Sequence, residues 1–504
     1  MPILDEYITV KEMVAIEMNS EYLGVSTQLM MENAGRGIAN EIAKRFPKTS
    51  KIVSVSGLTG NGGDAFTAAR HLAAMGYPVE SLVLGDPKNI TLDNSRVNYN
   101  AVAHMQDSIK LTPIKDSSLI PDIKAEVIID GLIGTSLHGP LRPPFLQMVQ
   151  AINKAAAYKV SIDIPTGMEA DTGKIYGEAV KADLTLTFHK PKLGYKHNPK
   201  ATKELIPTSI GIPPEAEYYI GPGDVWMLHQ YRQPDSHKGM WGTLLMVGGS
   251  ETYSGAPTLT SLAAYRMGLD LVYTAVPETA ATAVASASPS MITIKLKGER
   301  LTPDNIKQLE KTLDKVSAVA IGPGLGVAPE TVDAVSKLVE MVEKRKLPLV
   351  LDADGLKAYA ENPTKLKTPA VFTPHSREFK LLTEKKAEGT HLEKGLTVEK
   401  EAKRLGSVIL LKGSVDVVSD GKYTRYNWSG NPGMTVGGTG DVLTGIVGAY
   451  LAQGADPFYA AGAAAFINGR AGDLVKDERG YHLLPEDLIE KIPAVVEDCI
   501  SHRV

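Results

Sequence analysis

The sequence predicts two successive α/β domains, each built on a mainly parallel sheet. Short apolar segments of strand length alternate with longer segments of helical period in both halves of the chain, as in sheets covered on both faces. A stretch rich in Pro and Gly, residues 196–224, separates the two alternating series. The 504 residues suffice for two large domains. We therefore predict domains over residues 1–215 and 225–504, with the boundary near Gly221–Asp224.

In the first domain, helices and strands follow one another from the N-terminus. Thr9 and Glu12 form a capping box, which predicts the start of a helix. Further helices are predicted over residues 28–45, about 93–105 and about 144–157, besides one after the glycine-rich loop that follows residue 57. The predicted strands are 51–57, 79–85, 125–131, 158–165 and 182–188.

The second domain repeats this alternation and adds a hairpin. Helices are predicted over residues 258–268, 330–344 and 442–454. Asp420-Gly421 lies between two alternating segments, which predicts a β-hairpin with a type I′ turn over residues 415–427. The other predicted strands are 243–249, 271–277, 316–324, 348–354 and 408–413.

Composition favours small-molecule chemistry in a reducing compartment. The chain has 54 basic and 58 acidic residues and a net charge of -4, which gives no reason to expect nucleic acid or an anionic membrane as a partner. The single cysteine, Cys499, excludes an internal disulfide framework and a cysteine zinc cluster. The N-terminal segment has acidic residues and no apolar core of a signal peptide, and no uninterrupted apolar segment approaches the length of a membrane span. We expect a cytoplasmic protein.

The most informative segment is Asn431–Asp441, which contains four glycines and one carboxylate before an apolar helix. Unpaired N–H groups at such a helix start converge on phosphate oxygens, and the helix dipole adds to the attraction. Asp441 would then be placed to take a proton from a hydroxyl that attacks phosphate. The alternative is a glycine-rich turn in which Asp441 only caps the helix.

Three further loops of the second domain follow predicted strands, where ligands of α/β sheets bind. Gly322–Gly326 would let backbone approach a ligand closely. His375 and Glu378 lie one helical turn apart at a predicted helix start, although His375 alone could equally be a cap or a core histidine. Lys412 follows a strand and suits a diphosphate, although a lone lysine there is usually on the surface.

Together these loops resemble the ribokinase-like superfamily, and within it the NAD(P)H-hydrate dehydratases that use ADP or ATP. The resemblance rests on GNPGMTVGGTGDVLTG, VGGS, SGAP, GPGLG, LDADGL, TPH and LKGS, and it covers roughly residues 225–500. It implies a ribokinase-like α/β fold for this domain. One departure is Ser376-Arg377, where the family often has Pro-Gly.

The resemblance assigns residues of the second domain to ligands. Asp441 would be the catalytic base, with Gly438, Thr439 and Gly440 stabilising the transition-state charge. Glu378 would contact Mg²⁺ through water. The hydrated nicotinamide nucleotide would be bound by Ala256, Gly324, His375 and Asp441. ADP would be bound by Lys412, Gly413, Ser414, Val415, Asp416 and Gly440. The preference for ADP over ATP comes from the resemblance and not from the residues.

The first domain has its own glycine-rich loop, residues 57–64, between a predicted strand and a helix. It contains Asn61 and Asp64, and the glycines formally match a dinucleotide fingerprint, which alone is a weak signal. Two later strands end in Asp130 and Asp163, at the edge where doubly wound sheets bind ligands. Either acid alone could instead cap a helix or turn.

These residues resemble the NAD(P)H-hydrate epimerase domain over approximately residues 1–215, which implies a Rossmann-like three-layer α/β/α fold. A potassium ion would be bound by the oxygen ligands Asn61, Asp130 and Thr166. Asp163 would be catalytic and would shuttle a proton as the C6–O bond of the substrate opens and re-forms. The hydrated cofactor would be contacted by Gly60, Asn61, Gly62, Gly63, Asp64, Gly134, Thr135, Ser136, Leu137, His138, Gly139, Pro140 and Asp163.

The two resemblances imply consecutive steps of one repair reaction. The first domain would interconvert R and S epimers of NADH or NADPH hydrate and bind K⁺. The second would dehydrate the S epimer, with ADP as the expected co-substrate and Mg²⁺ as the expected ion. We expect these small molecules and further copies of the chain in a homo-oligomer as partners. Two rivals are a small-molecule kinase, such as one for a vitamin precursor, and a non-catalytic nucleotide-binding first domain.

Overall fold

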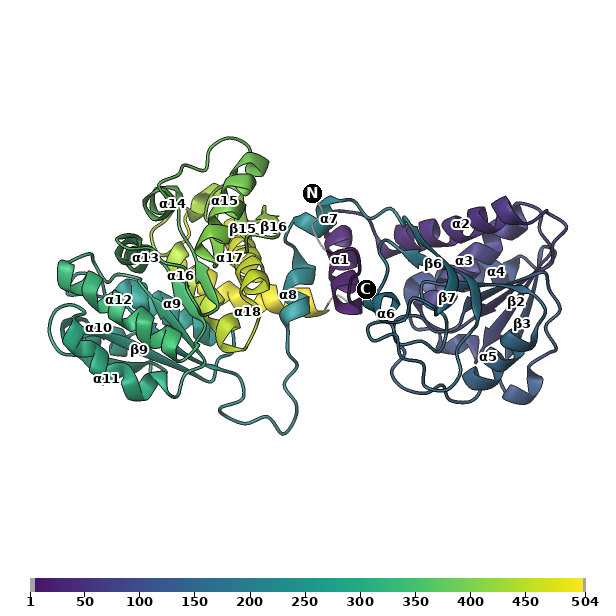
Figure 1. Cartoon of the computed structure of the whole chain (residues 1–504), viewed down its shortest axis with the longest axis horizontal. Coiled ribbons are helices and arrows are strands. Elements are labelled where there is room, and N and C mark those ends of the chain that lie inside the picture. Colours follow the sequence, from purple (N-terminus) through teal and green to yellow (C-terminus); the bar gives the residue numbers. More distant parts are fainter. Residues whose placement is uncertain (1–4, 502–504) are drawn as a thin grey trace. The chain divides into compact units, whose positions relative to one another are not determined.

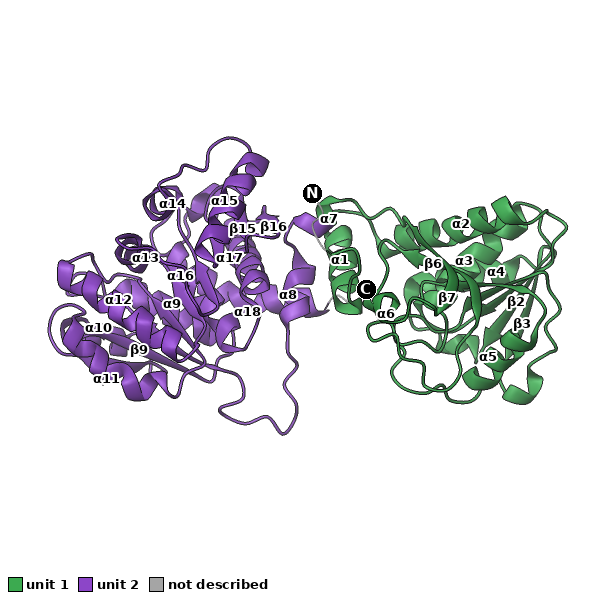
Figure 2. Cartoon of the chain, viewed as in Figure 1, with its two compact units in different colours: residues 1–216, 504 green, residues 217–503 purple. Residues whose placement is uncertain are grey.

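The computed structural model describes residues 5–501 and divides into two compact units (Figure 2). The first unit extends to Ala216 and the second begins at Glu217. The outermost residues of the two predicted domains, 1–4 and 502–504, lie outside the described part.

The first unit is built on a seven-stranded parallel sheet with the order β3-β2-β1-β4-β5-β6-β7. The order reverses between β1 and β4, so the loops after these strands diverge and leave room for a ligand. The strands are β1 (Ile52–Ser56), β2 (Val79–Leu84), β3 (Ile109–Ile114), β4 (Val127–Gly131), β5 (Tyr158–Ile162), β6 (Ala182–Phe188) and β7 (Thr202–Thr208).

Helices cover both faces of this sheet. Figure 1 shows α2, α3 and α4 along one face and α5 on the other. Adjacent residues of β1 belong to different cores: Ile52 packs with α2 and α3, whereas Val53 packs with α5. The helices are α1 (Val10–Tyr22), α2 (Thr27–Arg45), α3 (Gly60–Ala74), α4 (Asp93–His104), α5 (Phe145–Lys154) and α6 (Leu193–His197), with α7 (Glu215–Tyr218) at the junction of the units.

The second unit is built on a nine-stranded sheet with the order β10-β9-β8-β11-β12-β13-β14-β15-β16. Strands β8 to β14 are parallel, and β15 and β16 add an antiparallel hairpin. The strands are β8 (Thr243–Val247), β9 (Leu271–Pro277), β10 (Ile292–Leu296), β11 (Ala318–Ile321), β12 (Leu349–Leu351), β13 (Ala370–Phe372), β14 (Val408–Leu411), β15 (Asp416–Ser419) and β16 (Thr424–Asn427).

Two cores flank this sheet as well. Leu244 and Met246 of β8 pack with α16 and α17, while Leu245 and Val247 pack with α11 and α12 on the other face. The helices are α8 (Pro222–Leu228), α9 (Gly255–Arg266), α10 (Glu278–Ser286), α11 (Pro303–Leu313), α12 (Pro329–Lys344), α13 (Ala353–Ala360), α14 (Ser376–Thr383), α15 (His391–Leu405), α16 (Thr439–Ala452), α17 (Pro457–Arg479) and α18 (Pro485–Ser501).

The predicted α/β class with mainly parallel sheets is confirmed in both units, and the capping box of Thr9 and Glu12 is present. The type I′ turn is wrong. Ser419 pairs with Thr424, so four residues connect the strands, and the side chain of Asp420 accepts hydrogen bonds from the N–H groups of Lys422 and Tyr423. Among residues 5–501, no helix is both long and apolar enough to cross a membrane.

A buried ion pair ties the start of α8 to the hairpin, and it generates a stability prediction. The guanidinium of Arg425 (side chain 8% exposed) pairs with Asp224 (2% exposed). Asp224→Ala should lower the free energy of unfolding of the second unit by about 3–5 kcal/mol, because it leaves a buried cation without its partner. Asp333→Ala removes the exposed pair with Lys337 and should lower the free energy of unfolding by at most about 1 kcal/mol. Urea titration of both variants measures these changes. Equal effects would contradict the prediction.

Candidate active sites

The apolar helix predicted near Asp441 is present as α16, and no side chain caps its N-terminus. Gly438 precedes the helix with a φ of +105°, a left-handed conformation that glycine adopts without steric cost. The N–H of Val442 donates to the Gly438 carbonyl at 3.1 Å and closes the first turn. The N–H groups of Thr439, Gly440 and Asp441 therefore point out of the helix end, where they can bind an anion.

Asp441 lies in the first turn of α16, with its pKa raised from 3.8 to about 7. Burial is the largest cause, the charge of Asp352 adds to it, and Lys412 opposes both. Its carboxyl makes no hydrogen bond with another residue in 5–501, so it does not cap the helix. A carboxyl that exchanges its proton near neutral pH is suited to general-base catalysis.

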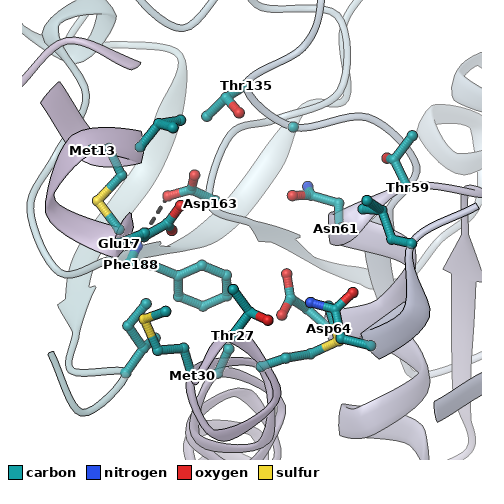
Figure 3. A pocket seen from close by; sticks show the side chains of 18 of the residues that line it. Met13, Glu17, Thr27, Met30, Thr59, Asn61, Asp64, Thr135, Asp163 and Phe188 are labelled. Carbon is teal, nitrogen blue, oxygen red and sulfur yellow. Dashed lines mark hydrogen bonds between the residues drawn. The ribbon is translucent and has the colours of Figure 1, made fainter. Parts of the chain in front are cut away.

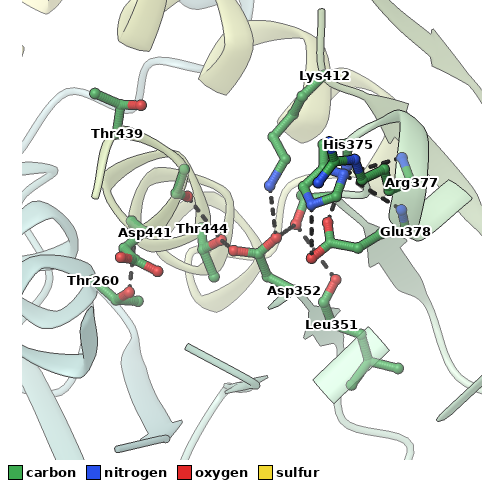
Figure 4. A network of polar contacts seen from close by, with 12 residues as sticks. Thr260, Leu351, Asp352, His375, Arg377, Glu378, Lys412, Thr439, Asp441 and Thr444 are labelled. Carbon is green, nitrogen blue, oxygen red and sulfur yellow. Dashed lines mark hydrogen bonds and ion pairs between the residues drawn. The ribbon is translucent and has the colours of Figure 1, made fainter. Parts of the chain in front are cut away.

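Asp352, which follows β12, lies at the centre of a polar network beside this helix end (Figure 4). Its Oδ1 accepts hydrogen bonds from Lys412 Nζ at 2.8 Å and Thr373 Oγ1 at 2.7 Å, and its Oδ2 accepts one from Thr444 Oγ1 at 2.8 Å. A Cβ atom on Gly440 would lie 3.3 Å from Lys412 Nζ, so the ammonium lies against the start of α16. Burial lowers the pKa of Lys412, but nearby carboxylates raise it more, so the lysine stays charged.

His375 and Glu378 form a capping box at the start of α14. Nδ1 of His375 accepts from the Arg377 N–H at 3.1 Å, and Glu378 Oε2 accepts from the His375 N–H at 3.0 Å. The imidazole is half exposed, whereas the Glu378 side chain is buried. His375 pairs with Lys412 in an isolated parallel bridge, which brings this loop to the lysine.

The remaining predicted residues of the second unit fall into two places. Ala256 and Gly324 lie together, since a Cβ atom on Gly324 would be 3.4 Å from the Cβ of Ala256. Gly413, Ser414 and Val415 form the turn between β14 and β15. Asp416 holds this turn, because its carboxylate accepts from the Gly413 N–H and from Asn427 Nδ2, both at 3.0 Å. Burial raises the pKa of Asp416 to about 6.

The first unit contains a cavity of about 330 Å³ where the sheet order reverses (Figure 3). Helix α1, the start of α3 and the ends of β5 and β6 contribute to its walls. Of the predicted substrate residues, it is lined by Gly60, Asn61, Asp64, Gly134, Thr135, Ser136 and Asp163. Residues outside this lining are Gly62, Gly63, Leu137, His138, Gly139 and Pro140.

Several of the residues outside the lining contact other parts of the first unit. Gly62 lies on the buried side of α3, where a Cβ atom would be 2.1 Å from the Gly57 carbonyl oxygen. Leu137 packs in a core, and His138 is exposed with Nδ1 3.6 Å from Glu169. Glycine at the start of α3 therefore permits the helix to approach the loop after β1.

Asp163 follows β5 in a left-handed conformation, with a φ of +58°. Its Oδ1 accepts hydrogen bonds from the buried Lys192 Nζ at 2.6 Å, Thr187 Oγ1 at 3.0 Å and the Phe188 N–H at 3.0 Å. Tyr195 donates to its backbone carbonyl at 2.8 Å. These contacts hold a non-glycine residue in a sparsely populated conformation, which is common at functional sites.

Asp130 and Thr166 lie close to the cavity and are joined to one another. The Thr166 hydroxyl donates to Asp130 Oδ1 at 2.6 Å, and its N–H donates to Oδ2 at 2.9 Å. Ser161 adds a third bond at 2.8 Å. Burial raises the pKa of Asp130 despite these bonds, and no described lysine or arginine pairs with it. Asn61 donates to the Ile162 carbonyl at 2.9 Å, and its Oδ1 faces Gly134.

The sequence analysis missed four polar residues in these sites: Glu17, Lys192, Asp352 and Thr444. Asp352 belongs to the LDADGL motif, so the sequence contained a signal that was not assigned to a role. Glu17 shares a helical stripe with Val10, Met13 and Val14, and a carboxyl in such a stripe could have indicated a ligand-facing position. Lys192 is fully buried, which no local pattern indicated.

Comparison with known proteins finds a different family model for each of the two units. A family model described as NAD(P)H-hydrate dehydratase matches residues 244–494, and one described as YjeF-related protein N-terminus matches residues 27–194. The chain is 42% identical to the bifunctional NAD(P)H-hydrate repair enzyme of Hyperthermus butylicus, over 99% of this chain and 94% of that protein. The chain belongs to the bifunctional NAD(P)H-hydrate repair enzymes.

Other relatives of this repair enzyme cover it equally well. The one from Pyrobaculum aerophilum is also 42% identical, over 97% of this chain and 98% of that protein. A solved structure of a ribokinase-like superfamily protein from Enterococcus faecalis matches 56% of this chain and 96% of its own, with a TM-score of 0.50 and 23% identity. That likeness shows a ribokinase-like fold, as the sequence analysis expected for the second unit.

The raised pKa of Asp441 generates a prediction about the stability of this repair enzyme. Because the folded pKa of about 7 exceeds the unfolded value near 3.8, the native state binds more protons between these values. Asp441 should therefore make wild-type stability fall as pH rises from about 4 to about 7, and Asp441→Asn should make that fall smaller; the other buried acids with raised pKa values keep their own part of it. Urea titrations across this range measure it, with the exposed Glu490→Gln as a control that should follow the wild type. Parallel curves for Asp441→Asn and the wild type would contradict the prediction.

Proposed function

We propose that the chain restores hydrated NADH and NADPH in two steps, carried out by residues 1–215 and 225–504. The first site interconverts the R and S epimers at C6, and the second converts the S epimer to the reduced cofactor at the expense of ADP. The observation that carries this proposal is that full-length repair enzymes match both halves, and each half has a site at a glycine-rich helix start.

In the second site, Asp441 takes the proton of the C6 hydroxyl, whose oxygen attacks the terminal phosphorus of ADP. AMP leaves, and the substrate becomes a phosphate ester. The N–H groups of residues 439–441 and the Lys412 ammonium stabilise the charge on the phosphoryl oxygens. Loss of phosphate from C6 and of a proton from C5 then re-forms the ring double bond, which gives NADH, AMP and inorganic phosphate in total.

Mg²⁺ fits this site as an ion that contacts the protein through its bound waters. No group of three or more Asp, Glu, His or Cys side chains within residues 5–501 is arranged to hold a metal by itself. Mg²⁺ keeps several waters and is commonly bound by substrate phosphates and one or two carboxylates. We propose that Glu378 contacts one of those waters, and that the ion neutralises phosphate charge. Glu378→Gln should weaken the Mg²⁺-dependent binding of ADP, which calorimetric titration measures.

In the first site, Asp163 assists the opening and re-formation of the C6–O bond. Its hydrogen bonds fall on Oδ1, so Oδ2 is available to the substrate. Departure of the hydroxyl leaves a cation shared by C6 and the ring nitrogen, which the carboxylate stabilises. Re-addition of water to the planar carbon from the other face gives the second epimer.

We propose that Asn61, Asp130 and Thr166 bind K⁺. Their side chains offer oxygen atoms, and no lysine or arginine within residues 5–501 pairs with the buried Asp130 carboxylate. Bound there, the ion would compensate the charge of that carboxylate. Replacing K⁺ by a large organic cation should lower the melting temperature of the first unit as well as its epimerase rate; an unchanged melting temperature would remove the ion from this group.

The test is recovery of absorbance at 340 nm from a mixture of R and S NADH hydrate, with ADP, ATP or no nucleotide. Nucleotide-dependent recovery of both epimers supports the whole proposal and identifies the donor. Recovery of the S fraction alone would remove the epimerase activity. The rival kinase reading predicts a stable phosphate ester and no inorganic phosphate, and full-length identity to repair enzymes does not favour it.

Asp441→Asn should reduce dehydration of the S epimer by about 10²–10⁴-fold, because it removes the catalytic base. The wild-type rate should rise with pH through about 7, as the Asp441 carboxyl loses its proton. Near-normal turnover by the variant in the 340 nm assay would exclude this role. Epimerisation, followed by chromatography of the two hydrates, should be unchanged.

Asp163→Asn should have the opposite selectivity. Epimerisation should be lost, because the substituted amide does not carry the charge that stabilises the ring cation. Dehydration of pure S hydrate should continue at the wild-type rate. An Asp163→Asn enzyme that still converts the full R and S mixture to NADH would contradict the proposed role.

A further inference from the structure

A second carboxyl, that of Glu17, opens into the first cavity beside Asp163 (Figure 3). Val10, Met13, Val14 and Glu17 form one stripe of α1, and all four line the cavity. Glu17 is the polar member of that stripe. Its side chain makes no hydrogen bond or ion pair with any other described residue, so the structure gives it no role in holding the fold together.

The charged groups that face Glu17 come from other elements. Lys192 precedes α6 and is bonded to Asp163, which follows β5, while Asp64 lies in α3. Burial raises the pKa of Glu17 to about 7; Lys192 lowers it and Asp163 raises it by smaller amounts. Near neutral pH, Glu17 therefore exists in both its acid and carboxylate forms.

The neighbouring Asp163 is differently equipped. Three donors, one of them a buried ammonium, bond to its Oδ1, so its position in the cavity is fixed and Oδ2 is left for the substrate. Asp163 thus suits stabilisation of the ring cation. The departing C6 oxygen, however, needs a proton, because hydroxide is a poor leaving group, and a separate acid in the cavity would supply it.

Asp64 is the other carboxyl of the cavity lining that makes no hydrogen bond or ion pair with a residue in 5–501. Burial, with the charges of Asp163 and Glu17, raises its pKa well above the ordinary value. Glu17 lies beside Asp163 in the cavity, whereas Asp64 lies apart from them at the start of α3 (Figure 3). This position makes Glu17 the better placed of the two carboxyls to act together with Asp163.

We propose that Glu17 is the general acid of epimerisation, donating its proton to the departing C6 oxygen and taking one back when water returns. This inference rests on the proposed epimerase function. The C6–O electron pair leaves with oxygen, the ring nitrogen lone pair forms the C=N bond, and the Glu17 proton completes a water molecule. Addition of water to the other face reverses these changes, and the released proton returns to Glu17. No oxidant, reductant or co-substrate is needed.

The test is the rate of R-to-S conversion without nucleotide, measured by chromatography on purified full-length enzyme. Glu17→Gln should slow it by about 10²–10⁴-fold, the usual contribution of a general acid. Dehydration of pure S hydrate should be unchanged. Glu21→Gln, one turn further along α1 and outside the cavity lining, is the matched control and should behave as the wild type.

The pH profile separates catalysis from packing. The wild-type rate should fall as pH rises through about 7, because the acid form of Glu17 is lost. Glu17→Gln should lack that fall in rate. Glu17→Asp should retain it at a reduced rate and at a lower pH, because the ordinary pKa of aspartate is below that of glutamate. If Glu17→Gln unfolds, the position of the fall in Glu17→Asp decides, and a fall at the wild-type pH would contradict the role.

The outcomes distinguish this inference from the function on which it rests. No epimerisation by the wild type would remove the epimerase function itself. If the wild type epimerises and Glu17→Gln does so at the same rate, Glu17 is not the general acid, although the epimerase function remains. The same conclusion follows if the rate of every variant falls at the same pH as that of the wild type.

Discussion

Both sites depend on helix N-termini that no side chain caps. Serine, threonine or aspartate normally satisfies the first N–H groups of a helix, but Gly438 and Thr59 make no side-chain cap bond to α16 and α3. The unsatisfied donors point to the carboxyl edge of a parallel sheet, where the loops diverge. The free energy that a cap would contribute is thus available for binding a ligand anion. The glycines around both helix starts follow from this, because a ligand must approach the backbone closely.

The second shared constraint is electrostatic. Each site pairs one lysine with one aspartate, Lys412 with Asp352 and Lys192 with Asp163. The lysine is held by its paired aspartate. A second acid, Asp441 in one site and Glu17 in the other, has no ion-pair partner among the described residues. Burial raises the pKa of each unpaired acid to about 7. An ordinary Asp or Glu side chain thus binds and releases protons at neutral pH because it is buried and is not part of the ion pair.

The sequence predicted the alternating strands and the glycine-rich loops because these signals are local. The sequence did not predict the strands at three sheet edges: β3 and β7 contain Pro113 and Pro207, which edge strands tolerate, and β10 is only partly buried. Helix α17 is buried on most sides, so it lacks an amphipathic stripe. The Lys192 contact with Asp163 joins residues 29 positions apart, and no periodic pattern encodes such a contact.

The different chemistry of the two steps explains why only one site contains a lysine directed at a helix start. Epimerisation interconverts two forms of similar energy, so it needs a proton donor and a stabilised cation but no activated co-substrate. The first-site lysine is accordingly fully buried and held by Asp163. Dehydration is made effectively irreversible by cleavage of a phosphoanhydride, so its site must hold phosphate groups. There the lysine side chain is 21% exposed and its ammonium lies against Gly440, where it can contact both Asp352 and a phosphate oxygen.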